Sequence, residues 1–234
     1  MLPLKTDLAS RTFPLVTVLL ILANAVVFLY QTSLQIGAAA IDLRVAEDFV
    51  LEFGLVPCRL TGTCTAPSGF PHPVATVFSS MFLHAGFLHV IGNMLYLWIF
   101  GTNVEDALGH GRFLAFYLLA GFLAALVQTA FHPDSPVPMI GASGAVAGVL
   151  GAYLLLFPYA TISTLLILGF FIRLVHVPAV IVLGFWFVVQ FMNGLIERSV
   201  GDIAGGVAWF AHIGGFLAGM ALLFLMRPRR WARL

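Results

Sequence analysis

Charged residues are scarce in this chain. Of its 234 residues only 9% are Asp, Glu, Lys or Arg, whereas 61% are hydrophobic, and the formal net charge is +1. A soluble domain carries about 25% charged and about 45–50% apolar residues. A water-soluble fold of this size cannot bury so much apolar surface, so the composition excludes one. We therefore predict an integral membrane protein.

Cysteines and basic runs are scarce as well. The two cysteines are too few for a disulfide scaffold. The chain is nearly neutral and has no basic run longer than two residues, so nucleic acid is excluded as an expected partner. The bilayer itself is the partner that the composition indicates.

Long apolar stretches are abundant, and a spanning helix needs about 20 mainly apolar residues. Six stretches are predicted to span the membrane: 14–34, 74–101, 113–131, 141–157, 177–196 and 206–226. The apolar stretch 162–174 has only 13 residues, so we interpret it as an interfacial or re-entrant segment. The predicted fold is an all-α polytopic bundle of six transmembrane helices in a single domain, residues 1–234.

The distribution of Lys and Arg predicts the orientation, because cytoplasmic loops carry more of them. With the N-terminus inside, eight lie on the cytoplasmic side: Lys5, Arg11, Arg112, Arg173, Arg227, Arg229, Arg230 and Arg233. Three lie outside: Arg44, Arg59 and Arg198. Both termini are therefore expected in the cytoplasm. A cleaved signal peptide is the alternative for the N-terminus, although the first apolar stretch is longer than the usual h-region of about 7–15 residues.

The long outer loop, 37–73, contains both cysteines. Cys58 and Cys64 are separated by five residues. In an oxidising compartment they can form a disulfide, and two free thiols are the alternative. A zinc site that also used His72 would lack a fourth ligand, so no metal is expected.

Three clusters of polar residues lie within the predicted spans, where polar side chains are costly and usually functional. Gly141, Ser143 and Gly144 begin the fourth span, and Gly148 and Gly151 continue a stripe of small residues. Such a stripe lets a second helix approach closely. The alternative interpretation is a packing seam in which Ser143 is merely one more small residue.

The other two clusters contain histidines. In the sixth span, His212, Gly215 and Gly219 share one helix face, and in the second span His89 and Asn93 do so, with His84 nearby. The alternatives are a core histidine bonded to a carbonyl for His212, and interhelical hydrogen bonds or a proton path for the second span.

The helix lengths suggest that the clusters meet. Ser143 and His212 each lie 14 residues, about 21 Å, before the end of their spans, which run in the same direction. The Pro-rich stretch 132–138 must enter the membrane to reach the short fourth span. Irregular backbone at that depth is tolerated where it lines a water-filled cavity.

A serine and a histidine beside such a cavity support hydrolysis. His212 can take the proton of Ser143 and later return it to a leaving amine. Since every Asp and Glu lies at a helix end or in a loop, we expect a Ser–His dyad without a third carboxylate. Asn93, His89 and the Ser143 backbone N–H could bind the oxyanion.

Four strings of the sequence form one pattern: Gly141-x-Ser143-Gly144, Ala211-His212-x-x-Gly215-x-x-x-Gly219, His84-x4-His89-x3-Asn93 and Gly101-x-Asn103-Val104-Glu105-Asp106-x-x-Gly109-x-x-Arg112. Taken together, they resemble the rhomboid intramembrane serine proteases. The resemblance runs from about the second span to the sixth. It implies a six-helix, bacterial-type fold in the inner membrane.

The resemblance also implies the chemistry. Ser143 would be the nucleophile, His212 the base, and Asn93 with His89 the oxyanion hole; His84, Gly141, Gly144, Gly215 and Gly219 would support them. Substrates of the family are transmembrane proteins cut near the outer membrane face, and no cofactor is needed. A substrate would enter past the fifth span, with Phe185, Trp186, Phe187 and Phe191. The oligomeric state is not predicted.

The sequence departs from the family pattern at one position beside the site. Family members often have an aromatic residue four positions after the serine, where it can stack on the histidine, and here Ala147 stands there. The Trp-Arg pair of some members is also absent from the first outer loop.

The remaining polar residues are interpreted as structural. We expect Asn24, Gln128, Gln190 and Asn193 to make interhelical hydrogen bonds, and Glu105 and Asp106 to lie in a solvated turn. Two other functions stay open. One is a catalytically silent rhomboid-like protein that binds and escorts membrane helices, and the other is a transporter or proton channel that uses His84, His89 and His212.

Overall fold

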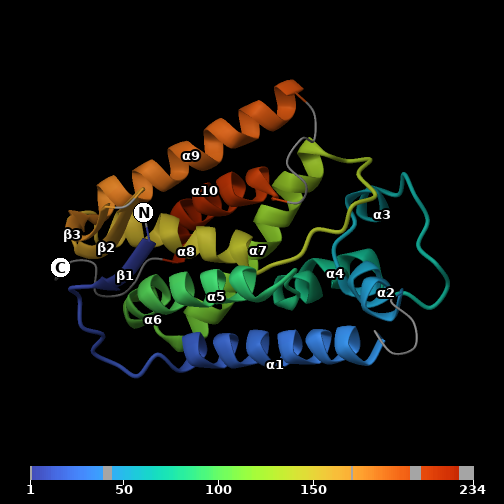
Figure 1. Ribbon diagram of the computed structural model, residues 1–234, viewed down its shortest axis with the longest axis horizontal. Coiled ribbons are helices and arrows are strands. Elements are labelled where there is room, and N and C mark those ends of the chain that lie inside the picture. The colour runs from blue at the N-terminus through green and yellow to red at the C-terminus, as the bar shows by residue number, and fades with distance from the viewer. Residues whose placement is uncertain (1, 39–43, 170, 201–206, 227–234) are drawn as a thin grey trace.

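The fold is mainly a bundle of helices (Figure 1). The computed structural model describes residues 2–38, 44–169, 171–200 and 207–226. The longer helices are α1 (Leu15–Ala38), α7 (His110–Phe131), α8 (Ser143–Leu156), α9 (Ala179–Val200) and α10 (Trp209–Met226). The shorter ones are α2 (Arg44–Phe53), α3 (Pro57–Thr61), α4 (Pro73–Ser79), α5 (Phe87–Tyr96), α6 (Thr102–Leu108), the 3₁₀ turn η1 (Ser80–Phe82) and the π-helical η2 (Leu97–Gly101). The predicted helical membrane bundle is confirmed.

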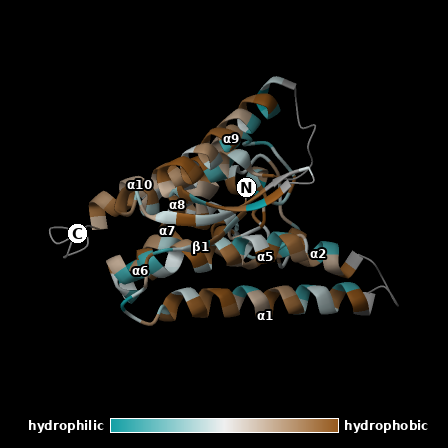
Figure 2. Cartoon of the chain, turned by 60° about the vertical axis from the view of Figure 1, so that its left-hand side comes forward, coloured by the Kyte–Doolittle hydropathy of each residue, from teal (hydrophilic) through white to brown (hydrophobic). Residues whose placement is uncertain are grey.

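Within the described ranges, five helices are long and apolar enough to cross a membrane. They are Leu15–Ile36, Phe87–Leu108, His110–Phe131, Ala179–Ser199 and Trp209–Met226. Hydrophobic residues predominate along these helices (Figure 2). Helix α8 has 14 residues and would extend about 21 Å, less than a hydrocarbon core of about 30 Å. The arginines at 227, 229, 230 and 233 lie outside the described residues.

The second span differs from the continuous helix expected over 74–101. Helix α4 continues into η1, which ends at Phe82; the backbone is extended at Leu83 and Gly86, and α5 begins at Phe87. The apolar segment that follows continues through η2 and α6 to Leu108. Gln31 of α1 bonds the buried backbone of His84 at the break: its Oε1 accepts from His84 N at 3.0 Å, and its Nε2 donates to His84 O at 3.4 Å. Hydropathy cannot reveal this break, because the residues around it are still apolar.

The segment expected to be interfacial or re-entrant is a β-hairpin. Strands β2 (Thr161–Leu168) and β3 (Phe171–Pro178) pair antiparallel, and β1 (Leu2–Thr6) pairs antiparallel with β2, so that Leu2 lies opposite Leu165. The order in the sheet is β1-β2-β3. The bundle is therefore mostly helical and not entirely so. β-Branched residues favour these strands, and Gly169, with φ +59°, lies at the turn between them.

Helices α8 and α10 pack with their backbones in contact, as the stripes of small residues predict. A Cβ atom added at Gly215 would overlap Gly144 O, and one at Gly219 would overlap Gly148 O. Gly151 likewise faces Phe216 O. Only glycine permits this approach, which holds the start of α8 beside the start of α10.

Glu105 does not lie in a solvated turn. Its side chain is fully buried, and it accepts hydrogen bonds from Val16 N, Thr17 N and Thr17 Oγ1 at 2.6–2.8 Å. His110 Nδ1 lies 2.5 Å from Glu105 Oε1, the oxygen that also accepts from Val16 N. The carboxylate therefore caps the N-terminus of α1, where backbone N–H groups lack intrahelical partners. Asp106 beside it accepts bonds from Thr12 N and Thr12 Oγ1.

Candidate active site

Ser143 and His212 lie in contact at the point where α8 and α10 approach each other. Ser143 is the first residue of α8, and His212 lies in the first turn of α10. His212 Nε2 is 2.8 Å from Ser143 Oγ, a hydrogen-bond distance. Gly215 and Gly144 allow this contact because the backbones of α8 and α10 touch at these two residues, and Gly144 directly follows Ser143. A histidine in this geometry can accept the serine proton.

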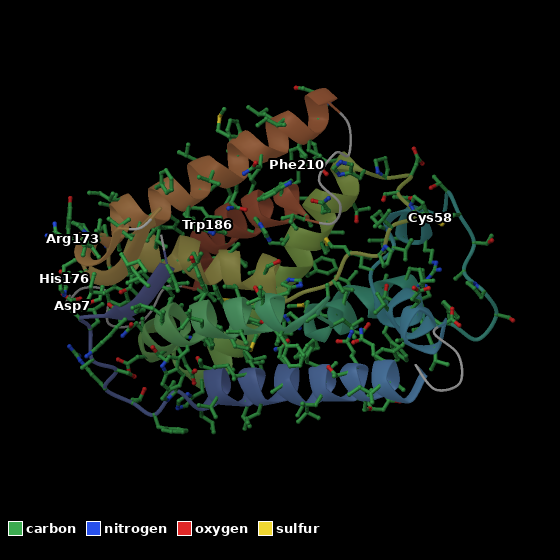
Figure 3. The ribbon with its side chains drawn as sticks, viewed as in Figure 1. Asp7, Cys58, Arg173, His176, Trp186 and Phe210 are labelled. Carbon is green, nitrogen blue, oxygen red and sulfur yellow. A yellow bond between two sulfur atoms is a disulfide. The ribbon has the colours of Figure 1, made fainter. Side chains whose placement is uncertain are left out.

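The other nitrogen of His212 is held by helix α9. Gln190 Oε1 lies 2.8 Å from His212 Nδ1, and Gln190 is only 6% exposed. One turn earlier, the ring of Trp186 lies 5.9 Å from the imidazole. Figure 3 shows Trp186 on α9. The sequence interpretation assigned Gln190 only a structural hydrogen bond, so its contact with the imidazole was missed.

Asn93 is held by His84 on the opposite side of the site. Asn93 Nδ2 lies 3.1 Å from His84 Nε2, and both residues are buried. His84 Nδ1 faces Phe82 O at 3.3 Å. Gln31 in turn bonds both backbone groups of His84, a role that sequence reasoning missed.

His89 lies against the loop that precedes α8. A Cβ atom at Gly141 would lie 2.7 Å from His89 Nε2 and 3.7 Å from Ser143 Oγ, so His89, Gly141 and Ser143 are neighbours. Gly141 has φ +121°, a conformation that other residues rarely adopt, and its N–H donates to Ser80 O at 2.9 Å. His89 Nδ1 accepts a bond from Ala85 N at 3.4 Å.

Backbone donors also surround Ser143. Val146 N, which bonds to Ala142 O, makes the first hydrogen bond of α8. The N–H groups of residues 143–145 precede that bond, so they lie at the positive end of the helix with no acceptor within it. A helix N-terminus of this kind favours negative charge close to the serine.

A cavity of about 600 Å³ opens beside these residues. Its walls include Ser143, His212, Asn93 and His89 together with the loop 135–141. The cavity continues toward Gln128, whose Oε1 accepts from Ala211 N at 3.0 Å and thereby links α7 to α10. The irregular loop before α8 lines the cavity, in agreement with the expectation drawn from its prolines.

Cys58 and Cys64 form a disulfide, which decides between the two interpretations of this pair. Cys58 lies at the end of the molecule opposite Asp7, Arg173 and His176 (Figure 3). Among the described residues, no group of three or more His, Cys, Asp and Glu side chains could hold a metal ion.

A model of the Rhomboid domain matches residues 71–229, more than half of the sequence and all of the site. The chain belongs to the rhomboid family. It is 39% identical over 144 residues to the rhomboid protease GluP of Bacillus subtilis, a match that covers 60% of this chain and 24% of the relative. It is 32% identical over 160 residues to RHOMBOID-like protein 1 of Arabidopsis thaliana, a match that covers 68% of this chain and 36% of that protein.

Relatives also occur in organelles. Rhomboid protein 1, mitochondrial, of Saccharomyces cerevisiae is 33% identical over 151 residues, which cover 62% of this chain and 40% of that protein. The matches therefore span less than half the length of each of these three curated relatives. With its apolar helices and its family, this rhomboid is an integral membrane protein.

Proposed function

We propose that this rhomboid is an intramembrane serine endopeptidase that cleaves transmembrane proteins with a Ser143–His212 dyad. The observation that carries the proposal is the 2.8 Å contact between Ser143 Oγ and His212 Nε2 at the wall of a cavity. The name of the Bacillus subtilis relative, a rhomboid protease, supports it. A family member without protease activity would have no need of a serine and a histidine held in this geometry.

In the first half of the reaction, Ser143 Oγ attacks the scissile carbonyl carbon while its proton passes to His212 Nε2. The carbonyl π-electrons move to the oxygen, which becomes an oxyanion. The N–H groups at the start of α8 and Asn93 Nδ2 would stabilise this charge, and His89 beside Gly141 would close that side of the site. The C–N bond then breaks, and the imidazolium gives its proton to the leaving amine.

In the second half, water in the cavity attacks the acyl-serine ester and gives a proton to His212 Nε2. The tetrahedral intermediate collapses, the carboxyl product leaves, and the proton returns to Ser143 Oγ. The cavity is large enough to admit this water, and it is lined by polar groups that can bind it.

The orientation proposed for this cycle places both termini in the cytoplasm, in a bacterial inner membrane. The start of α8 then lies toward the outer face, so substrates would be cut near that face. A substrate helix would approach past α9, which exposes Phe185 and Phe191.

Labelling with a fluorescent fluorophosphonate tests the dyad. The probe bonds to a serine whose surroundings make it nucleophilic, so the purified protein should be labelled, whereas Ser143→Ala and His212→Ala should not be. Ser135→Ala is the matched control, because Ser135 also lies at the cavity wall but its Oγ accepts only from Val137 N in the described contacts. That variant should be labelled like the parent.

Absence of labelling in a folded protein would contradict the proposal and favour the escort, in which Ser143 is part of a packing seam. A pH-dependent flux in liposomes that survives Ser143→Ala would favour the transporter instead. Cleavage of a reconstituted single-pass substrate, lost in Ser143→Ala, would extend the proposal from a reactive serine to a protease.

A further inference from the structure

The hydrogen-bond partners of His212 determine where its ring proton lies. The amide oxygen of Gln190 can only accept, and it lies 2.8 Å from Nδ1. Nδ1 therefore carries the hydrogen. In a neutral imidazole Nε2 then has the lone pair, and this lone pair faces Ser143 Oγ. Only this tautomer can take the serine proton.

Helix α9 also supports the imidazole ring from the side. Trp186 and Gln190 are four residues apart, so they share one face of α9, and both contact His212. Ala147, the residue four positions after the serine, is fully buried and offers only a methyl group. The aromatic contact across the helices therefore comes from α9 and not from α8.

The Gln190 contact is not a general feature of polar residues on α9. Asn193, one turn later, donates its Nδ2 hydrogen to Val189 O within its own helix. Gln190 instead reaches a side chain on α10. Because a buried amide is costly without partners, this contact fixes the positions of both groups.

We propose that Gln190 is a positioning residue that selects the reactive tautomer of His212, and that Trp186 holds the plane of the ring. This inference rests on the proposed protease function. It assigns to α9 a part in the chemistry, although the nucleophile and the base come from α8 and α10. The orienting group is a neutral amide in place of the carboxylate that a triad would use.

The test compares Gln190→Leu, which removes the acceptor, with Gln190→Glu, which keeps an acceptor oxygen at the same reach. Asn193→Leu is the matched control, because it removes an amide from the same helix without touching His212. Two quantities are measured on the full chain in detergent: the rate constant of fluorophosphonate labelling, and the ¹⁵N chemical shifts of the His212 ring. The second reports the tautomer directly, and a purely structural residue would not change it.

We expect the parent to show a protonated Nδ1 and an unprotonated Nε2. In Gln190→Leu the labelling rate should fall at least about tenfold, which corresponds to the loss of one hydrogen bond of about 1.4 kcal/mol, and the Nε2 signal should move toward the protonated form. Gln190→Glu should keep most of the labelling, and Asn193→Leu all of it.

Three results would overturn the inference: an unprotonated Nδ1 in the parent, undiminished labelling of Gln190→Leu, or an equal loss in Gln190→Glu and Gln190→Leu. The parent spectrum alone is decisive if a variant does not fold. Failure of the protease proposal looks different, because the parent would then not be labelled at all while its spectrum would still report the tautomer.

Discussion

Asn93 can donate a hydrogen bond to an oxyanion, because His84 accepts only one of the two hydrogens on Asn93 Nδ2. Phe82 O can only accept, so His84 Nδ1 carries a hydrogen and Nε2 accepts from Asn93 Nδ2. The second hydrogen on Nδ2 is then available on the side of the cavity that Asn93 lines. This fixed orientation is what an oxyanion donor needs, since it requires no rearrangement during the reaction.

Replacing Asn93 by Ala should therefore lower the turnover of a transmembrane substrate by about 10²–10³-fold, as loss of one donor does in soluble oxyanion holes. Asn193→Ala is the control, since its amide bonds within α9, and its turnover should equal that of the parent. The measurement is initial cleavage rate in proteoliposomes. An unchanged rate for Asn93→Ala would assign the donor role to another group.

The sequence could indicate which residues meet in the site but not how their side chains are oriented. Ser143 and His212 were expected at the same depth, and they are in contact. Gln190 and Gln128 make the interhelical bonds expected of them, whereas Asn24 and Asn193 bond to carbonyls of their own helices. An isolated amide in a span has several possible partners, and only the helix packing selects one.

At the scale of the helices, the contact between α8 and α10 depends on glycine. Gly215→Ala places a methyl group against Gly144 O and must push the two helices apart. We expect it to lower the free energy of unfolding by about 1–3 kcal/mol and to abolish labelling of Ser143.

Gly184→Ala is the matched control, because a Cβ atom at this position of α9 meets no atom within 4 Å. Its stability and labelling should match or exceed those of the parent, since Ala favours helix more than Gly. Thermal unfolding in detergent measures the stability of each variant, and fluorophosphonate labelling measures the reactivity of Ser143. Equal stability and equal labelling of Gly215→Ala and Gly184→Ala would show that the contact between α8 and α10 tolerates a methyl group.

The Glu105 carboxylate that caps the N-terminus of α1 gives a second prediction at the scale of the helices. Glu105→Ala leaves Val16 N, Thr17 N and Thr17 Oγ1 without their acceptor. The loss should be about 1–3 kcal/mol, the cost of an unsatisfied buried polar group. Asp106→Ala should cost less, because its bonds to Thr12 are exposed to solvent. Denaturant titration in mixed micelles would measure the free energy of unfolding of both variants. If Glu105→Ala and Asp106→Ala lost equal stability, burial of the Glu105 carboxylate would not explain its contribution.

Some elements could not be predicted because hydropathy does not distinguish them. The stretch 162–174 is too short to span, which the sequence indicated, but its apolar residues suit an interfacial segment and a strand equally. Its β-branched residues and Gly169 were the available signal for a hairpin. The pairing of β1 with β2 joins residues about 160 positions apart, which no local pattern shows.

At the scale of the whole molecule, the sheet and the disulfide-bonded loop lie at opposite ends. Strand β1, with Lys5, and strand β3, with Arg173, are at one end, and α2 and α3 are at the other (Figure 1). The proposed orientation places the sheet in the cytoplasm and the loop outside. A reagent that does not cross the membrane should therefore reach residues of the loop in intact cells but not residues near the sheet.

Cysteine labelling checks this orientation. In a Cys58→Ser, Cys64→Ser background, Ser68→Cys should react with a membrane-impermeant maleimide on intact spheroplasts, whereas Ser10→Cys should react only after lysis. Both serines are exposed in the structure, so a difference reports the side of the membrane and not burial. The reverse pattern would invert the assigned topology.

The position of β1 in the sheet has a consequence for biosynthesis. Leu2 is synthesised well before its partner Leu165, which follows about 160 residues later, a delay on the order of 10 s at the usual rate of translation. Until then β1 has no strand to pair with, although α1 and several other helices have already been synthesised. Strand β1 can thus take its place in the sheet only after helices α1 to α8 have been synthesised, so this end of the molecule is completed late.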